Sequence, residues 1–495
     1  MILMRMFVTL ILLFITFFPA PLIAQELADK VQQYQLENGL TLLIVERYSS
    51  PTVAAYITFR VGGVNETSDQ RGVAHLLEHV LFKGTKTLGT INYRKEKPLL
   101  EQIEQVGSEI DRLKIEPHAD EERLAALRAQ LAELQQDHRK LVVKDEFSRI
   151  YAENGGVGFN AFTSKDLTSY VISLPANKLE LWAAIESDRL QNAVLREFYT
   201  ERDVVREERR RSYESSPGGL LYETLLATAY RMHPYRNPVI GWDSDIDNLS
   251  LAETRTFLKD YYAPVNMIIT LVGDVEAEKA LELVKGYFGK IAPGKPVPAV
   301  ADREPQQRGE RRAQVVFDAE PQLVIAYHKP TMPHRDDYVF DLLMQILAEG
   351  RTSRLYRKLV VEDQLAASVG VYGAPGSRYD NLMVISATPR YPHTVEEVEA
   401  AVYAELERLK EELVTPGELE KCRNRILTDF LRGLNGNEGL ARMLSSYQAL
   451  NGDWRYLVNY ETEIKKLTQD DLRDVARRYF KPENRTVVTL SREDM

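Results

Sequence analysis

Residues 249–272 read LSLAETRTFLKDYYAPVNMIITLV, and residues 467–490 read LTQDDLRDVARRYFKPENRTVVTL, so two segments of equal length follow one pattern. Each begins with a Ser or Thr that is followed three residues later by an acidic residue, the capping-box pattern of a helix start. Each then passes through an aromatic, Pro and Asn turn into an apolar run typical of a buried strand. The repetition predicts that the chain contains the same helix, turn and strand unit twice.

The sequence between the two copies supports a division into two domains. Residues 291–312 are rich in Pro, Gly, Gln and charged residues, which is the composition of a linker. On both sides of it, β-rich runs precede longer helical patterns. We therefore predict an α+β fold of two homologous sheet-plus-helix domains in tandem, residues 25–290 and residues 313–495.

Residues 93–150 interrupt the symmetry of the two domains. Their composition is rich in Leu, Glu, Gln and Arg, with apolar residues spaced by three and four, and Glu116-Pro117 separates two such runs. This pattern predicts an antiparallel helical hairpin inserted into the first domain. We expect His118 and His138, which lie in the insertion, at the surface and not in a metal site.

The composition excludes some classes of function. The formal net charge is −10, so the positive footprint of a nucleic-acid-binding protein is missing. Apolar residues make up 44% of the chain, enough for a sizeable core. Cys422 is the single cysteine, so no intrachain disulfide can form, and we expect it to be a small structural residue.

The first 24 residues have the pattern of a secretory signal peptide. Arg5 precedes an apolar run over residues 6–18, and the small residue Ala24 stands before a polar one. This run is shorter than the roughly 20 residues of a membrane span, and prolines follow it, so we favour cleavage after Ala24 over a retained anchor. The mature chain is then expected in the periplasm or secreted, with no membrane span.

Residues 72–82, GVAHLLEHVLF, predict an apolar helix that carries chemically active side chains. His75 and His79 are four residues apart, so both imidazoles lie on one face and can bind one ion. Glu78 can reach a metal-bound water without being a ligand, and the pattern is the inverted zinc-peptidase motif HxxEH. Zinc activates water and polarises a carbonyl, while a carboxylate moves the proton. We predict one Zn²⁺ per chain, with Glu78 as general base.

A third protein ligand is expected at a hydrolytic zinc site. Residues 197–208, EFYTERDVVREE, predict a helix in which Glu201 and Glu208 are seven residues apart and lie on one face. Either glutamate can be the ligand, and the other can orient a histidine by binding the ring nitrogen that does not bind the metal. Their spacing alone does not decide between them.

Residues 158–164, GFNAFTS, lead into a predicted strand over residues 169–174. Polar and aromatic residues alternate in this stretch, so it could offer a strand edge to an extended peptide. An ordinary strand start is the alternative interpretation.

The HLLEH and ERDVVREE segments in a duplicated α+β chain resemble the pitrilysin/insulinase family of zinc metallopeptidases, and in particular bacterial members related to mitochondrial processing peptidase. The resemblance implies a complete set of site residues: His75, His79 and Glu208 as ligands, Glu78 as base and Glu201 as the supporting carboxylate. It also implies that the strand beside the metal binds substrate through Asn160, Ala161, Phe162 and Thr163.

The second domain departs from the family pattern. Residues 350–356, GRTSRLY, resemble the family's C-terminal segment, in which an Arg and a Tyr help to bind substrate. The resemblance places those two positions at Val360 and Ala367, which have no side-chain donor. Three nearby side chains that could compensate are Arg351, Arg354 and Tyr356. Otherwise a related partner subunit would supply the missing pair.

The sequence therefore predicts a zinc-dependent endopeptidase for peptides or unfolded polypeptide segments, acting as a homodimer or as a heterodimer with a related subunit. The alternative is a non-catalytic scaffold or partner-binding subunit, which would not need to keep His75, Glu78, His79 and Glu208 together. A third hypothesis is that the helical insertion docks a partner protein.

Overall fold

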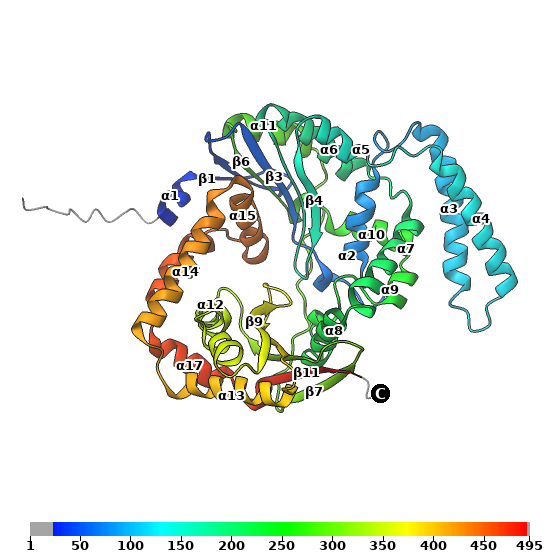
Figure 1. Cartoon of the computed structure of the whole chain (residues 1–495). Helices are drawn as coiled ribbons and strands as arrows, with labels where there is room; N and C mark the ends of the chain where they lie inside the picture. The colour runs from blue at the N-terminus through cyan, green and yellow to red at the C-terminus, as the bar shows by residue number, and fades with distance from the viewer. Residues whose placement is uncertain (1–22, 493–495) are drawn as a thin grey trace, which may run out of the picture.

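The strands of the computed structural model, which describes residues 23–492, form two sheets at opposite ends of the molecule (Figure 1). The first sheet has the order β1-β2-β6-β3-β5-β4 and the second β7-β11-β8-β10-β9. The first comprises β1 (Val31–Gln35), β2 (Thr41–Glu46), β3 (Thr52–Phe59), β4 (Val157–Thr163), β5 (Thr168–Pro175) and β6 (Met267–Gly273). The second comprises β7 (Arg311–Val316), β8 (Gln322–Lys329), β9 (Ala366–Ala374), β10 (Asn381–Pro389) and β11 (Arg485–Ser491).

Helices cover both sheets, and the predicted α+β class is confirmed. Those that precede the linker are α1 (Ile23–Lys30), α2 (Val73–Val80), α3 (Tyr93–Leu113), α4 (Glu121–Arg139), α5 (Glu146–Glu153), α6 (Leu179–Asn192), α7 (Phe198–Arg209), α8 (Pro217–Ala229), α9 (Asp243–Asn248), α10 (Leu251–Tyr261) and α11 (Ala277–Phe288). Those that follow it are α12 (Arg335–Ala348), α13 (Val395–Glu411), α14 (Pro416–Asn435), α15 (Asn437–Asn451), α16 (Tyr456–Lys466) and α17 (Gln469–Tyr479). Residues 292–308 between them contain no helix or strand.

The two repeated sequence segments form the same unit in both halves. Ser250 caps α10 and Thr468 caps α17, each through a capping box. Each helix leads through a short turn into an inner strand, β6 or β11, that pairs in parallel with one neighbour and antiparallel with the other. The predicted internal repeat is therefore present in the fold.

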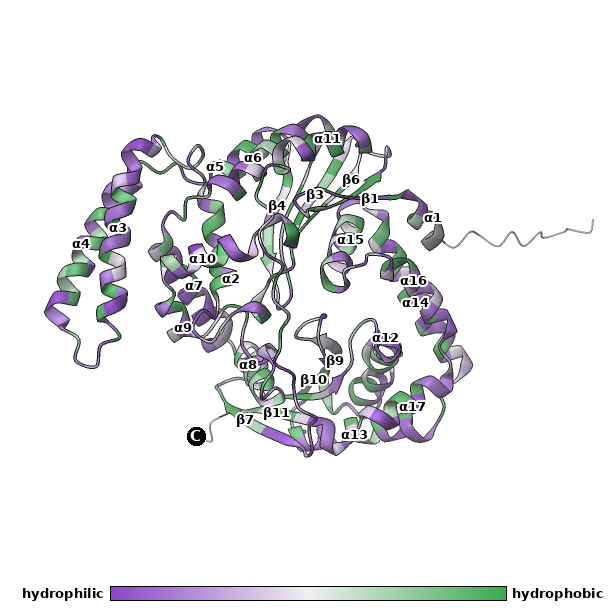
Figure 2. Ribbon diagram, turned by 180° about the vertical axis from the view of Figure 1, so that it is seen from behind, coloured by the Kyte–Doolittle hydropathy of each residue, from purple (hydrophilic) through white to green (hydrophobic). Residues whose placement is uncertain are grey.

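The halves exchange helices across the molecule. Along β2, Leu42 and Ile44 face α2, α6 and α11, whereas Leu43 and Val45 face α15 from the second half. In return, α8 from the first half packs on the second sheet, where Leu225 contacts the core that contains Val488. This two-sided burial explains why the side chains on both faces of these strands are apolar. In Figure 2, β3 and β6 of the first sheet are coloured mostly as hydrophobic.

The insertion forms the predicted hairpin, in which α3 and α4 pack against each other and project from the body (Figure 1). His118 is exposed, as expected. The expectation for His138 is wrong, because this side chain is only 2% exposed and its Nε2 lies 2.8 Å from Oε1 of Glu96. Arg196 also binds Glu96, so a buried ion cluster anchors the hairpin to the body.

The predicted signal peptide, residues 1–24, lies outside the described residues except for its last two positions. Within residues 23–492, no helix is both long enough and apolar enough to span a bilayer.

Candidate metal centre

Helix α2 presents its polar side chains away from the first core. Its apolar residues, including Val73, Leu76 and Val80, are buried against the sheet. The helix starts after Gly72, which has a φ of 87° and where a Cβ would lie 2.4 Å from the carbonyl oxygen of Ile240. Packing on one face therefore leaves the opposite face of α2 free for its two histidines and glutamate.

The half-buried carboxyl group of Glu66 caps the N-terminus of α2. Glu66 accepts hydrogen bonds from the backbone N–H groups of Gly72 and Ala74, each at 2.9 Å. Burial raises the pKa of Glu66 to about 8, although both backbone hydrogen bonds act in the other direction. Glu66 thus satisfies the first-turn donors of the helix that carries the site.

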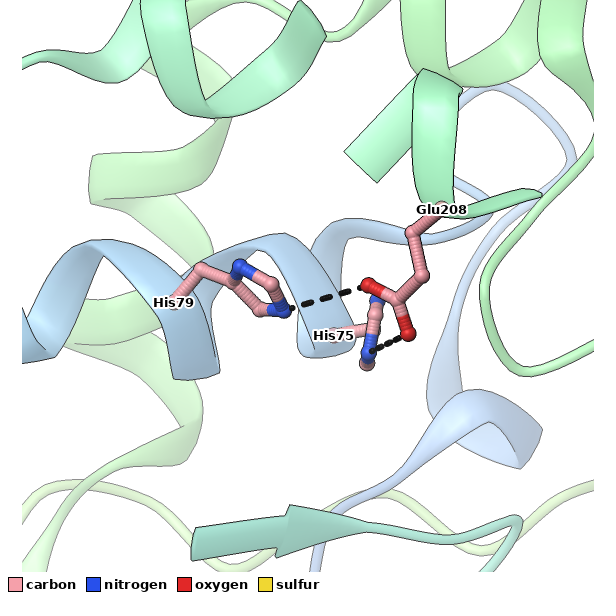
Figure 3. A group of neighbouring side chains, drawn as sticks. All are labelled: His75, His79 and Glu208. Carbon is pink, nitrogen blue, oxygen red and sulfur yellow. Dashed lines mark ion pairs between the residues drawn. The ribbon is translucent and has the colours of Figure 1, made fainter. Parts of the chain in front are cut away.

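His75, His79 and Glu208 come together in one cluster, drawn in Figure 3. Nε2 of His75 lies 3.8 Å from Oε1 of Glu208, and Nε2 of His79 lies 3.5 Å from its Oε2. One donor atom of each residue lies within 4.8 Å of the other two. Helix α7 therefore brings its glutamate over the histidines of α2.

The two glutamates of α7 occupy different places. Glu208 faces Nε2 of both histidines, whereas Oε2 of Glu201 lies 3.5 Å from Nδ1 of His79. Oε1 of Glu201 pairs with Nζ of Lys83 at 2.6 Å. The spacing of Glu201 and Glu208 in the sequence did not distinguish them, but in the structure they occupy different positions around His79.

The electrostatics of the cluster act in opposite directions on its two histidines. Burial, together with the neighbouring His79, lowers the pKa of His75 to about 3, so this imidazole is neutral near pH 7. Burial alone would raise the pKa of Glu201, but hydrogen bonds with His79 and Lys83 outweigh it and lower the pKa. For His79, burial is outweighed by the surrounding carboxylates, which raise its pKa.

Glu78 lies beside the cluster and is held by the edge strand of the first sheet. The Thr163 hydroxyl at the end of β4 donates a 2.6 Å hydrogen bond to Oε2 of Glu78. Burial raises the pKa of Glu78, and this hydrogen bond opposes the shift. The Thr163 side chain, predicted to bind substrate, therefore contacts the expected base.

The other expected substrate-binding residues also lie on β4, one of the two edge strands of the first sheet. Asn160 and Phe162 are exposed, whereas Ala161 is buried, so the strand turns alternate side chains outward. Ala161 can therefore contribute only its backbone to a bound peptide.

The two positions at which the family resemblance expects an Arg and a Tyr both lie in the second half. Val360 lies in a helical turn, Tyr356–Glu362, and packs on the second core, while Ala367 is exposed on β9. Arg354 is bound to Glu418 and Glu405 and is not free to compensate. Arg351 is exposed.

Sequence reasoning did not single out Lys83 or Glu66. Lys83 follows His79 by four residues. This spacing places two side chains on the same face of a helix, so it could have indicated that Lys83 lies near His79. Glu66 lies in the loop before α2, and no sequence pattern marks it as the cap of that helix.

The donor atoms of the cluster fit a zinc ion. A direct hydrogen bond between nitrogen and oxygen would measure about 2.9 Å. Two ligand atoms on a tetrahedral zinc with bonds of about 2.0–2.1 Å lie about 3.4 Å apart. The observed separations of 3.5 and 3.8 Å, which end at different oxygens of Glu208, are nearer to the second value than to the first, and the three ligand atoms lie within 4.8 Å of one another. Two imidazoles and a carboxylate are also the ligand types that catalytic zinc prefers.

A duplicated α+β fold with an HxxEH helix facing a glutamate is the arrangement of the inverted zincins. Residues 42–111 and 140–243 match the family described as insulinase (peptidase family M16), and residues 248–426 match the peptidase M16 inactive domain. The chain belongs to this M16 family, as its resemblance implied. The gap in the first match, residues 112–139, falls within the helical hairpin.

Individual relatives extend the match over most of the chain. The sequence is 30% identical over 475 residues to the zinc protease PqqE of Helicobacter pylori, covering 94% of both chains. It is 24% identical over 267 residues to a probable mitochondrial-processing peptidase subunit beta of Schizosaccharomyces pombe, covering 53% of this chain and 46% of that one. A crystal structure of a protease from Helicobacter pylori superposes with a TM-score of 0.78, at 29% identity over 93% of this chain and 99% of that one.

Proposed function

We propose that the protein is a zinc-dependent endopeptidase that hydrolyses peptides or unfolded polypeptide segments. The observation that carries this proposal is the placement of His75, His79 and Glu208 around one point, with Glu78 beside them. The relative named a zinc protease, 30% identical over nearly the whole chain, supports the same chemistry.

His75, His79 and Glu208 would hold one zinc ion per chain, which supplies a Lewis acid that lowers the pKa of water to about 7 and polarises the scissile carbonyl. Glu201 orients His79 by keeping a proton on Nδ1, so that the Nε2 lone pair faces Glu208. Lys83 keeps Glu201 ionised for this task.

Glu78 acts as the general base. Its Oε2 is held by the Thr163 hydroxyl, which leaves Oε1 to accept a proton from the attacking water and return it to the leaving amine. The raised pKa of the half-buried Glu78 makes its carboxylate a stronger base.

The substrate would bind as an extended strand along the free edge of β4. In this arrangement Asn160, Ala161 and Phe162 contact the peptide, and Thr163 marks the end of the strand nearest to the base. Strand addition uses the peptide backbone and so suits unfolded segments of varied sequence.

We further propose that the chain is exported to the periplasm or secreted, which its N-terminal pattern supports. The absence of an Arg/Tyr pair at Val360 and Ala367 favours a dimer in which a related subunit completes the substrate site. The probable processing-peptidase relative is named a subunit, which agrees with such an assembly.

A scaffold or partner-binding role is the second candidate, favoured by the match of residues 248–426 to an M16 domain described as inactive. The distinguishing experiment is hydrolysis of a quenched peptide library by the zinc-loaded protein and by its Glu78→Gln variant. We expect Glu78→Gln to keep its zinc and lose at least about 100-fold in kcat. A zinc-loaded but inactive wild type, alone and mixed with a related subunit, would favour the scaffold.

A further inference from the structure

The turn that follows β4, residues 164–167, fixes the end of the strand that carries Thr163. Thr163 in turn holds Oε2 of Glu78. The backbone N–H groups of residues 63–64 donate hydrogen bonds of 3.1 and 2.8 Å to this turn. The turn also contains Asp166, which is only 3% exposed. The expected base is therefore held by a short segment with a buried carboxylate.

The carboxylate of Asp166 binds the backbone of the second half. Its Oδ2 accepts hydrogen bonds from the N–H groups of Ser377 at 2.7 Å and Arg378 at 3.3 Å. Both donors lie in the loop between β9 and β10, residues 375–380. Burial raises the pKa of Asp166, and these hydrogen bonds oppose the shift. A charged acceptor strengthens such bonds, so the turn beside the base is firmly linked to the second sheet.

Tyr235 takes part in the same contact. Its hydroxyl donates a 2.7 Å hydrogen bond to Oδ1 of Asp166. The same hydroxyl oxygen accepts hydrogen bonds from the N–H groups of Arg378 and Tyr379, each at 3.2 Å. Tyr235 belongs to the first half, yet its ring is fully buried in the core beside the second sheet. We refer to Asp166, Tyr235 and the N–H groups of residues 377–379 as the inter-half clasp.

The second half holds the loop of the inter-half clasp from two sides. Nη2 of Arg378 donates a 2.9 Å hydrogen bond to the carbonyl oxygen of Ala449 in α15. The Thr331 hydroxyl, just before α12, donates a 2.8 Å hydrogen bond to the carbonyl oxygen of Ser377. The loop therefore offers its N–H groups at positions that the second half determines.

Close contact in the inter-half clasp depends on a glycine. A Cβ at Gly376 would lie 2.3 Å from the hydroxyl oxygen of Tyr235 and 2.6 Å from Oδ2 of Asp166. An alanine at this position would push the loop away from both side chains, because a packed interior has no room for an extra methyl group. At Gly373, three residues earlier, the nearest neighbouring atom would be 3.8 Å from a Cβ, so an alanine fits there.

We propose that Asp166 and Tyr235 are positioning residues through which the second half holds Thr163, and with it Glu78, in place for proton transfer. Asp166 is three residues from Thr163, so a shift of its carboxylate moves the end of β4. This inference rests on the proposed peptidase function. It gives the part of the chain that matches an M16 domain described as inactive a role in the chemistry of the first half.

Gly376→Ala tests the proposal from the second half. We expect kcat for one quenched peptide to fall about fivefold, with KM and zinc content nearly unchanged, because a small displacement of a reacting group lowers the rate more than binding. The matched control Gly373→Ala adds the same methyl group where there is space, and it should keep the kcat of wild type.

The Thr163→Val protein distinguishes positioning from a general loss of stability. If the inter-half clasp acts through the Thr163 hydroxyl, Gly376→Ala should lower kcat about fivefold in wild type but by at most about twofold when Thr163 is already valine. Equal losses in both backgrounds, or the kcat of wild type in Gly376→Ala, would overturn the proposal.

Tyr235→Phe replaces Gly376→Ala if that variant does not fold, since it removes only the hydroxyl group of the clasp. The same loss of about fivefold in kcat is expected, with the same dependence on Thr163. Tyr230→Phe is its matched control, because Tyr230 is also fully buried and its hydroxyl donates to the carbonyl oxygen of Asp380 in the same loop.

Hydrogen exchange of the full chain with zinc added measures the inter-half clasp without catalysis. Amides of residues 164–168 and 376–379 should exchange about tenfold faster in Tyr235→Phe than in wild type. Unchanged exchange of residues 164–168 would overturn the proposal even if the protein hydrolyses no peptide. Faster exchange together with an inactive wild type would support the clasp as a link between the halves and would contradict the peptidase proposal alone.

Discussion

Glu201 and Glu208 lie on one face of α7, yet they contact opposite nitrogen atoms of the His79 ring. The difference follows from the position of α2, whose second histidine fits between the two carboxylates. Glu208 reaches the side that His75 shares, and Glu201 reaches the side next to Lys83. At the scale of residues, the proposed site thus consists of three metal-ligand atoms, the proposed base Glu78 and the groups that hold them in place.

Lys83→Met should weaken zinc binding although Lys83 contacts neither histidine. Without the ammonium group of Lys83, Glu201 loses its ion pair, and its interaction with Nδ1 of His79 becomes weaker. Mutation of a residue that orients a metal ligand lowers metal affinity by about 10- to 100-fold. We expect a loss of about tenfold in zinc affinity for Lys83, which is one residue further from the ligand. A chelator competition measures it. Lys86→Met, at an exposed position, is the matched control, and equal affinities in both variants would refute the role of Lys83.

Thr163→Val removes one hydroxyl with little change of shape. The variant should bind zinc normally, because Thr163 contacts only Glu78 in the site. We expect kcat to fall about tenfold with KM nearly unchanged, since the base is less well positioned for proton transfer. Steady-state kinetics with one quenched peptide provides the measurement, and an unchanged kcat would remove Thr163 from the mechanism.

At the scale of elements, the hairpin α3–α4 depends on a buried ion cluster. Glu96, fully buried, contacts His138 and Arg196. Burial alone would raise the pKa of Glu96, but the hydrogen bonds from both partners and the charge of Arg196 lower it to about 2. A carboxyl with a lowered pKa stabilises the fold above its unfolded pKa of about 4.3, and this contribution is lost as the pH falls from there toward 2.

Glu96→Gln should therefore destabilise the protein at pH 7 by about 3 kcal/mol, because Arg196 keeps a buried charge without its partner. The difference in the free energy of unfolding between Glu96→Gln and wild type should become smaller as the pH falls below about 4.3. Urea midpoints of both proteins at pH 7, 5 and 3.5 test this. If the difference in urea midpoint between wild type and Glu96→Gln stays constant at these three pH values, the charge of Glu96 does not contribute to the stability of the fold.

The exchange of α8 and α15 makes the two halves dependent on each other. Without α15, the first sheet would expose Leu43, Val45 and Tyr56 to water. We expect residues 25–300 to aggregate when expressed alone and to form a soluble one-to-one complex when expressed with residues 301–495. Size-exclusion chromatography distinguishes the outcomes, and a stable, cooperatively folding fragment 25–300 would contradict this interdependence.

Local patterns in the sequence predicted much of this structure. The capping boxes at Ser250 and Thr468 and the HxxEH spacing depend only on neighbouring residues, so they could be recognised directly. The burial of His138 and the hydrogen bond from Thr163 to Glu78 depend on segments 42 and 85 residues apart and could not be recognised in this way. The same holds for the exchange of α8 and α15, because strands buried on both faces do not indicate which helix covers them.

For the whole molecule, we propose that α2 and α7 together form one metal site. This proposal is tested most directly by zinc content and affinity of the wild type, Glu208→Gln and Glu201→Gln. We expect one zinc per wild-type chain, a loss of at least about 100-fold in zinc affinity for Glu208→Gln and a loss of about tenfold for Glu201→Gln. Full zinc affinity in Glu208→Gln would contradict it.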